Sequence, residues 1–471
     1  MNSSRRRAAH HAAAARRPAP DRNVRGVLEF SGHLADLTTG SLTHVLSRAG
    51  GPRLNAVRGA GVYVYDAEGR KYLDGSSGPL AVNLGHGVPE ILAAMERQLH
   101  QITFAHGSEF TTEAQERAAD LVVAFTPLGL SRVFFVSGGS EATETAIKMV
   151  RQYWVDAGQP SKYKIISKRA SYHGATLGAL SLSGFAGRRG PYEPLLLPFP
   201  QIPEVHCRAC PYGLTYGKCA IECATELERV ILREGAGTVA AFIAEPLSGA
   251  ANAAVVPPPE YFRIVREICD RHGVLFIADE VMTGFGRTGA NFAIDHWGVI
   301  PDLVVCAKGL GAGYAPIGAV VAHDRVGDQI LRVSGRFIHG HTYAGNPLAC
   351  ATAAAVLEYV QTHDLVAEAK RKGSVLEREL APIRRHPCVA EVRGMGLMWG
   401  VEFSAPAGAR PAGPAVVETA IRNGLLVYPA GGSLPGSAAN QILVGPPLTI
   451  TDTEIGELGR LLRKSVGDTF A

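Results

Sequence analysis

The chain has 471 residues, of which 46% are hydrophobic and 19% are charged, and its formal net charge is +4. Such a length predicts two or three domains, and the composition is typical of a soluble globular enzyme. The small net charge does not indicate nucleic-acid binding. No stretch reaches the roughly 18 apolar residues of a membrane span, so we expect no membrane partner.

The first 26 residues form a low-complexity segment with seven arginines and one acid, Asp21. We expect a disordered basic tail here, and an Arg-rich, acid-poor transit peptide is the alternative. The segment has no leucine-rich core of the kind found in secretory signals.

The rest of the chain divides into three stretches. Residues 27–85 contain VYVYD and KYLDG, two alternating strands joined by the turn AEGR, and we assign them to the N-terminal part of a small domain. In residues 86–344, helical patterns alternate with the apolar runs SRVFFVS, YKIISK, TVAAFIAE, GVLFIADEV, DLVVCAK and PIGAVVAH. This alternation predicts a large α/β domain with a mostly parallel sheet between helices. Residues 345–471 predict a smaller α+β unit.

Two ionisable residues stand at the ends of these apolar runs. Asp279 ends one strand candidate and Lys308, 29 residues later, ends another, and a glycine-rich loop follows each. Functional residues gather at the carboxyl ends of parallel strands, and a lysine is costly to bury alone. The pair therefore suggests a lysine that forms a Schiff base and an acid that holds a cationic ring nitrogen.

A possible phosphate site follows the run SRVFFV. Gly138 and Gly139 allow a ligand to approach the backbone, and a helix is expected to begin at Ser140. Free N–H groups and the positive end of the helix dipole suit a phosphate there. Taken alone, the same pattern also fits a plain tight turn.

Three further strand ends could serve a flat heterocycle. Asp279 and Val281 are two residues apart, so they are expected to share one face of a strand, with the valine against the ring plane. Tyr172, next to His173, could stack on the opposite face, and Glu245 is expected to face the cleft. The alternatives are a capped strand end and a structural Tyr–His pair.

Together these motifs resemble those of the class III aminotransferases, the omega-transaminase group of the fold type I pyridoxal 5'-phosphate (PLP) enzymes. The resemblance covers residues of about 45–465, in the family's order: YLDGSSG, NLGHG, SGGSEATETAIKM, SYHGAT, AEPLSGA, ADEVMTGFGRTG, AKGLGAGYAPIGA, HTYAGNPLAC and VRGMGLMWGVE. It implies that the large PLP-binding domain contains a seven-stranded sheet of the kind found in this fold, and that the protein is a homodimer with shared active sites.

The resemblance also implies roles for single residues. Lys308 would form the Schiff base and move the proton, and Asp279 would keep the pyridine nitrogen protonated. The other implied cofactor contacts are Gly138, Gly139, Ser140, Tyr172, His173, Glu245, Val281 and Thr342, the last reaching a phosphate across the dimer interface.

The places where relatives bind a substrate carboxylate differ in this chain. Leu443 and Ala250 stand where some relatives have an arginine and its neutralising glutamate, and no arginine occurs between Arg422 and Arg460. We therefore expect a small keto acid or an aldehyde to be preferred over 2-oxoglutarate as acceptor. Arg393 is the nearest guanidinium in a family motif, and it could bind a carboxylate or form a salt bridge within the small domain.

At the expected substrate mouth, SSGPLAVN places Pro79 and Leu80 where relatives can carry a large aromatic residue, which suggests room for an apolar amine. The candidate substrate contacts are Leu80, Tyr172 and Arg393.

The cysteines fall into two groups. Residues 203–224 form an insertion with the run HCRACPYGLTYGKCAIEC, in which Cys207, Cys210, Cys219 and Cys223 resemble a zinc knuckle. Thiols or a local disulfide are the alternative, and we assign no metal ligand. The other four cysteines are isolated, and most lie in apolar runs, as expected in a reducing compartment such as the cytoplasm.

The sequence thus predicts a PLP-dependent aminotransferase that moves an amino group from an amine or omega-amino donor to a keto-acid acceptor in ping-pong half-reactions. Another fold type I enzyme, such as a decarboxylase, aminomutase or racemase, is the alternative. A DNA-binding regulator on this fold would need an extra domain, for which about 26 residues are too few.

Overall fold

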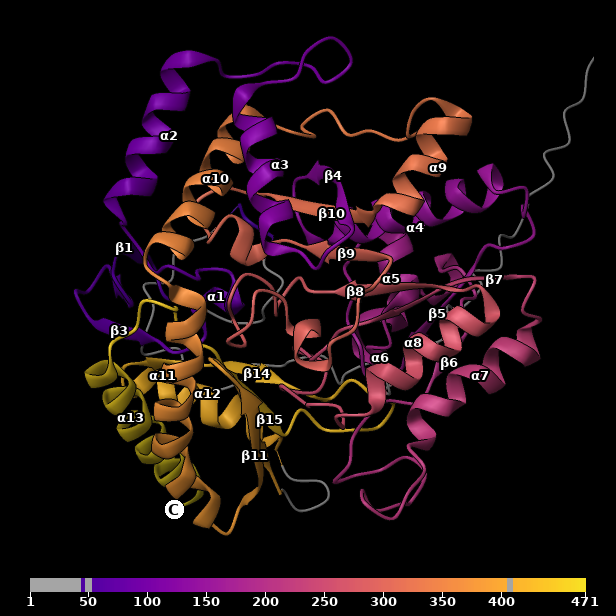
Figure 1. The fold of residues 1–471 in the computed structure, drawn as a ribbon. Coiled ribbons are helices and arrows are strands. Elements are labelled where there is room, and N and C mark those ends of the chain that lie inside the picture. Colours follow the sequence, from indigo (N-terminus) through magenta and orange to yellow (C-terminus); the bar gives the residue numbers. More distant parts are fainter. Residues whose placement is uncertain (1–43, 47–52, 405–409) are drawn as a thin grey trace, which may run out of the picture.

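The computed structural model describes residues 44–46, 53–404 and 410–471, so the predicted basic tail lies outside the described residues. A seven-stranded sheet with the order β4-β10-β9-β8-β7-β5-β6 crosses the centre of the molecule (Figure 1). Its strands are β4 (Leu130–Val136), β5 (Lys164–Lys168), β6 (Gln201–Ile202), β7 (Val239–Ala244), β8 (Leu275–Asp279), β9 (Leu303–Cys306) and β10 (Gly318–His323). Strands β5 to β9 pair in parallel, whereas β10 is antiparallel to both of its neighbours. Every strand predicted for this sheet is present.

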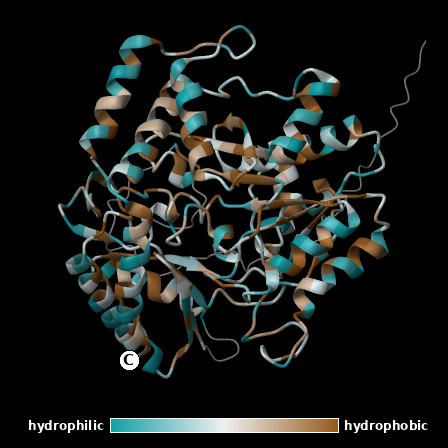
Figure 2. Cartoon of the chain, viewed as in Figure 1, coloured by the Kyte–Doolittle hydropathy of each residue, from teal (hydrophilic) through white to brown (hydrophobic). Residues whose placement is uncertain are grey.

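The centre of the sheet is buried because its strands are apolar almost throughout: β7 is VAAFIA, β8 is LFIAD and β9 is LVVC. All residues of β7, β8 and β9 are buried, as expected for parallel strands covered on both faces. Figure 2 shows this as brown central strands among helices that carry teal residues on their outer turns. Helix α8 illustrates the fit, since its buried residues follow a helical period: Tyr261, Phe262, Val265, Ile268 and Cys269.

The larger helices around this sheet are α2 (Pro89–Gln101), α3 (Glu113–Phe125), α4 (Gly139–Asp156), α5 (Leu177–Leu182), α7 (Glu222–Glu234), α8 (Tyr261–His272), α9 (Asp324–Ser334) and α10 (Pro347–Thr362). Shorter turns are α1 (Ser77–Leu80), α6 (Ala186–Arg189), η3 (Gly190–Leu195), η4 (Ala293–Trp297), η5 (Lys308–Leu310) and η6 (Ala381–Arg385). Among the described residues, no helix has both the length and the apolar character needed to cross a membrane.

Two four-stranded sheets complete the structure. One has the order β1-β2-β3-β13 and the other the order β11-β12-β15-β14. Their strands are β1 (Ala56–Ala60), β2 (Tyr63–Asp66), β3 (Lys71–Asp74), β11 (Val389–Met395), β12 (Met398–Phe403), β13 (Leu425–Leu426), β14 (Tyr428–Ala430) and β15 (Gln441–Val444). Helices α11 (Leu365–Leu380), α12 (Ala412–Arg422) and α13 (Asp452–Phe470) gather beside the second sheet, at the lower left of Figure 1. Because β3 pairs in parallel with β13, the N-terminal strands join the C-terminal part of the chain. The domain boundaries themselves stay a prediction.

Candidate active site

A cavity of about 280 Å³ lies at the carboxyl ends of the parallel strands. Most of the predicted cofactor residues line it: Gly139, Ser140, Tyr172, His173, Glu245, Asp279, Val281 and Lys308. The wall also includes residues that the sequence did not single out, namely Gly78, Ala81, Gly174, Arg188, Leu247, Met282 and Thr283, together with Tyr428 from the stretch between Arg422 and Arg460 that contains no arginine. The fold therefore brings to one place side chains that are widely separated in the chain.

Asp279 is the last residue of β8 and only 3% of it is exposed. Its Oδ2 lies 2.6 Å from Nδ1 of His173, and its Oδ1 accepts a hydrogen bond of 3.1 Å from the backbone N–H of Val281. Nε2 of His173 is buried without a hydrogen-bond partner among the described residues. Val281 lies beyond the end of β8, so the turn and not the alternation of the strand brings it to the cavity.

Lys308 begins the short turn η5, two residues after the end of β9. Its backbone has φ = +42°, in the left-handed region, and its carbonyl accepts hydrogen bonds from Gly311 N at 3.1 Å and Ala312 N at 2.9 Å. A non-glycine residue in such a conformation costs about 1–3 kcal/mol and is typical of functional sites. The turn thus fixes the backbone of the lysine while its half-buried side chain lines the cavity.

The N-terminus of α4 forms another part of the wall. The helix begins at Gly139, one residue before the predicted start, and Gly138 is its N-cap. A Cβ atom on Gly139 would lie 2.9 Å from Cγ1 of Val281, so this approach requires a glycine. The Ser140 hydroxyl accepts a hydrogen bond of 3.0 Å from Ala175 N. Gly138 itself does not line the cavity.

Glu245 is buried directly after β7 and faces the cavity as predicted. Its Oε2 accepts from Tyr172 N at 3.1 Å and its Oε1 from Gly249 N at 2.9 Å. Burial raises the pKa of this carboxyl group. Lys168 Nζ donates to the Glu245 carbonyl at 3.2 Å, and burial lowers the pKa of that amine. Glu245 therefore ties the Tyr172 loop to the loop that follows β7.

Like Gly138, the predicted contacts Leu80 and Thr342 lie outside this cavity. Leu80 is only 1% exposed and is buried in the core, with Gly445 at close range. Its neighbours Pro79 and Ala81 line the cavity in its place, so the geometry does not support the substrate contact predicted for Leu80. Thr342 is exposed and is not part of the wall formed by its own chain.

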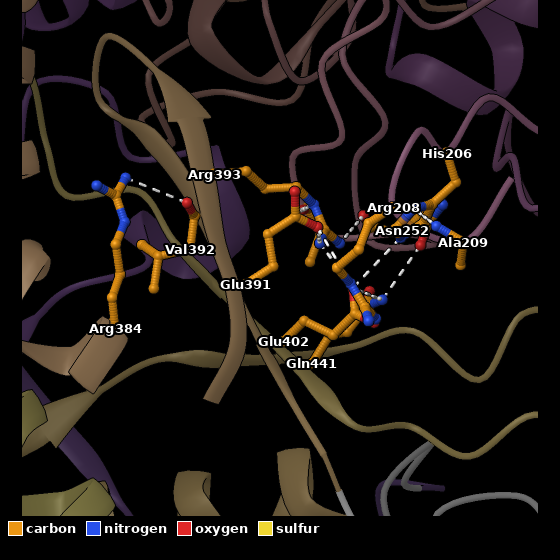
Figure 3. Close-up of polar contacts among 11 residues, drawn as sticks. His206, Arg208, Ala209, Asn252, Arg384, Glu391, Val392, Arg393, Glu402 and Gln441 are labelled. Carbon is orange, nitrogen blue, oxygen red and sulfur yellow. Dashed lines mark hydrogen bonds and ion pairs between the residues drawn. The ribbon is translucent and has the colours of Figure 1, made fainter. Parts of the chain in front are cut away.

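Arg393 also lies outside the cavity, within a cluster of charged residues (Figure 3). Its Nη1 lies 2.6 Å from carboxylate oxygens of both Glu391 and Glu402. Its Nη2 donates to Asn252 O at 3.0 Å and its Nε to Ala253 O at 3.1 Å. The geometry thus favours the salt-bridge interpretation over carboxylate binding, because Arg393 already holds two acids and a loop backbone.

The four cysteines of the insertion are free thiols that line one small pocket of about 20 Å³. Among the described residues, one group of three possible metal ligands has donor atoms within 4.8 Å of one another. It consists of His206, Glu391 and Glu402 and includes no cysteine. Arg208 and Arg393 both pair with Glu402 and compensate its charge. Among the described residues the four cysteines share one pocket but form no such group, so the zinc knuckle stays a prediction.

Comparisons with known proteins identify the family of this chain. The family model for class III aminotransferases matches residues 46–466. The chain belongs to the class III aminotransferase family. It is similar to the uncharacterized aminotransferase YodT of Bacillus subtilis, with 42% identity over 86% of this chain and 93% of YodT. It is also similar to the putrescine–pyruvate aminotransferase of Pseudomonas aeruginosa, with 36% identity over 87% of this chain and 90% of that protein.

Solved structures of omega-transaminases share the fold. A thermostable (S)-enantioselective omega-transaminase from Thermomicrobium roseum superposes with a TM-score of 0.84 and 36% identity, covering 91% of this chain and 97% of that one. The Pseudomonas jessenii omega-transaminase in complex with PMP gives a TM-score of 0.85 and 32% identity, over 91% and 96% of the two chains. This class III aminotransferase is therefore a PLP-dependent enzyme on the predicted α/β fold.

The residues that line the cavity fit PLP. A buried carboxylate, Asp279, can accept a hydrogen bond from a protonated ring nitrogen. The free N–H groups at the start of α4 and the Ser140 hydroxyl suit a phosphate group. The amine of Lys308 suits an aldehyde carbon.

Arg188 is the main residue of the cavity wall that was not predicted from the sequence. It lines the cavity but lies in no motif that the family resemblance assigns to the site, whereas Tyr428 lies in the stretch between Arg422 and Arg460 that contains no arginine. The available signal was the pair Arg188–Arg189 in SLSGFAGRRG, a short way past Tyr172.

Proposed function

We propose that this aminotransferase takes an amino group from an amine or omega-amino donor and gives it to a small keto acid, with Lys308 as the proton carrier. The observation that carries the proposal is the convergence of Lys308, Asp279 and the N-terminus of α4 on one cavity. When bound, PLP supplies an aldehyde carbon that joins to amines and a cationic ring that accepts electrons.

Each protein group has a defined task in this proposal. The Nζ of Lys308 takes the proton from the amine-bearing carbon of the donor and delivers a proton to the keto carbon of the acceptor in the second half-reaction. Asp279, oriented by His173, keeps the proton on the ring nitrogen. Tyr172, positioned by its backbone hydrogen bond to Glu245, covers one face of the ring and excludes water.

The wall of the cavity supports the proposed substrate class. Leu247, Ala250 and Met282 give it an apolar part that suits the carbon chain of an amine. The relatives named for their substrates point the same way, since one is a putrescine–pyruvate aminotransferase and another is a gamma-aminobutyrate transaminase from Oryza sativa.

We further propose a homodimer in which Thr342 reaches the active site of the partner subunit. Its exposure, outside the cavity of its own chain, supports this arrangement. Exposed apolar side chains nearby in sequence, Ile338 at 65% and Tyr343 at 64%, are suited to an interface. All eight cysteines are free thiols, which supports a reducing location such as the cytoplasm.

A donor and acceptor panel tests the proposal. Holoenzyme is mixed with a diamine, an omega-amino acid or an arylalkylamine, and the absorption of the bound cofactor is followed. We expect at least one donor to bleach the aldehyde form, and pyruvate to restore it faster than 2-oxoglutarate. A clear preference for 2-oxoglutarate contradicts the proposed acceptor class, and release of CO₂ from an amino-acid donor contradicts the proposed reaction.

A further inference from the structure

Arg188 is a cation in the wall of the cofactor cavity, held between aromatic side chains. It lies in the short turn α6, and its Cζ is 4.2 Å from the ring centre of Tyr172 and 4.6 Å from that of Phe185. Its Nη2 donates a hydrogen bond of 3.3 Å to the hydroxyl of Tyr428 in β14, from the C-terminal part of the chain. The guanidinium is therefore directed by stacking on one side and by a hydroxyl on another.

The adjacent arginine shows how different this environment is. Arg189 pairs with Glu193 and donates to the backbone carbonyls of Leu180, Ser181 and Ser183, so its role is structural. Arg188 forms no ion pair with any residue that the structure describes, and its hydrogen bond to Tyr428 uses one of five N–H donors.

The acids of the cavity do not compensate this charge by contact. Asp279 is held by His173, and Glu245 is held by backbone N–H groups of Tyr172 and Gly249. A guanidinium with spare donors in the wall of a partly enclosed cavity is suited to an anionic ligand, and its planar fork matches a carboxylate.

We propose that Arg188 binds the carboxylate of the keto-acid acceptor, an inference that rests on the proposed aminotransfer. The stack on Tyr172 and the bond to Tyr428 hold the side chain at the wall when the substrate is an amine without a carboxylate. Tyr428 lies between Arg422 and Arg460, a stretch that contains no arginine. The arginine for the carboxylate therefore comes from α6, as Arg188. Among the described residues that line the cavity, Arg188 is the sole arginine, so an acceptor with one carboxylate fits better than one with two.

The test is a comparison of two acceptors in single-turnover experiments. Holoenzyme of wild type, Arg188→Leu and Arg188→Lys is first converted to the amino form of the cofactor with an amine that lacks a carboxylate. Each protein is then mixed with pyruvate or with propanal, an uncharged acceptor that also has three carbons. The recovery of the cofactor's aldehyde absorption gives the rate for each acceptor.

We expect Arg188→Leu to slow the reaction with pyruvate at least about 10-fold, the loss typical of a charge-assisted hydrogen bond, and to change the reaction with propanal by less than about 2-fold. Arg188→Lys should give an intermediate loss with pyruvate, because an ammonium keeps the charge but not the planar fork. The control Arg393→Ala removes a guanidinium outside the cavity and should affect both acceptors equally.

The outcomes separate the inference from the proposed function. A wild-type protein that exchanges with neither donor nor acceptor contradicts the proposed function itself. If the wild type is active but Arg188→Leu and Arg188→Lys keep the wild-type ratio of the rates with pyruvate and with propanal, the inference about Arg188 is wrong and the proposed function stands. Cofactor absorption and melting temperature of each variant show that the compared proteins are folded and loaded.

Discussion

Substitution of Gly139 by alanine should weaken cofactor binding through a clash with Val281. The added Cβ would lie 2.9 Å from Cγ1 and 3.1 Å from Cγ2 of Val281, whereas carbon atoms in packed interiors lie about 3.5–4.0 Å apart. Relieving such overpacking costs about 1–3 kcal/mol, which is roughly 5- to 150-fold in an equilibrium constant. Val281 lines the cavity, so in the apoprotein it can move into that space at little cost, and the penalty falls on PLP binding.

The assay is titration of apoprotein with PLP, followed by the absorption of the bound cofactor. Gly139→Ala should raise the dissociation constant by the factor above while the melting temperature of the apoprotein changes little. In the double variant Gly139→Ala/Val281→Ala, the smaller side chain leaves room for the new methyl group, so PLP should bind more tightly than to Gly139→Ala alone. Additive losses in the double variant, or an apoprotein destabilised as much as PLP binding is weakened, would refute the steric reasoning.

Two further predictions concern the dimer and the dependence of stability on pH. Thr342→Ala should weaken PLP binding about 10- to 150-fold through loss of a hydrogen bond to phosphate. Mixing Thr342→Ala subunits with inactive Lys308→Ala subunits should give dimers in which one site has both Lys308 and Thr342, and subunit-exchange activity assays measure the activity of that site. No gain in activity on mixing argues against a shared site. Burial raises the pKa of Glu280 to about 7 from an ordinary value of 4.5, so the folded state binds more protons than the unfolded state between these values. The free energy of unfolding should fall as pH rises through this window, and Glu280→Gln should flatten the fall in denaturant titrations; an unchanged slope contradicts this.

Much of the large sheet could be predicted from the sequence because its strands are apolar on both faces and are separated by amphipathic helices. The same logic placed Asp279 and Lys308 at strand ends, where the fold brings them to one cavity. These features depend on local patterns, namely the length of an apolar run and the residue that ends it.

The side-chain environments that depend on distant partners could not be predicted in this way. Leu80 has a left-handed backbone (φ = +59°), which lies outside any regular alternation, and its side chain is buried in the core. Arg393 is held by Glu402 from the neighbouring strand and by the backbone at residues 252–253, about 140 positions earlier in the chain. Arg188 reaches the cavity because α6 folds back over Tyr172, a contact that no periodicity indicates.

The central claim is that Lys308 carries the cofactor, and borohydride reduction followed by peptide mapping tests it most directly. Reduction of the holoenzyme fixes PLP to the amine that holds it, and digestion then locates the labelled lysine. We expect the label on Lys308 and none on Lys308→Ala, a variant that should still bind PLP through its phosphate contacts but lose nearly all turnover. A label on another lysine of the wild-type protein would contradict the assignment of Lys308.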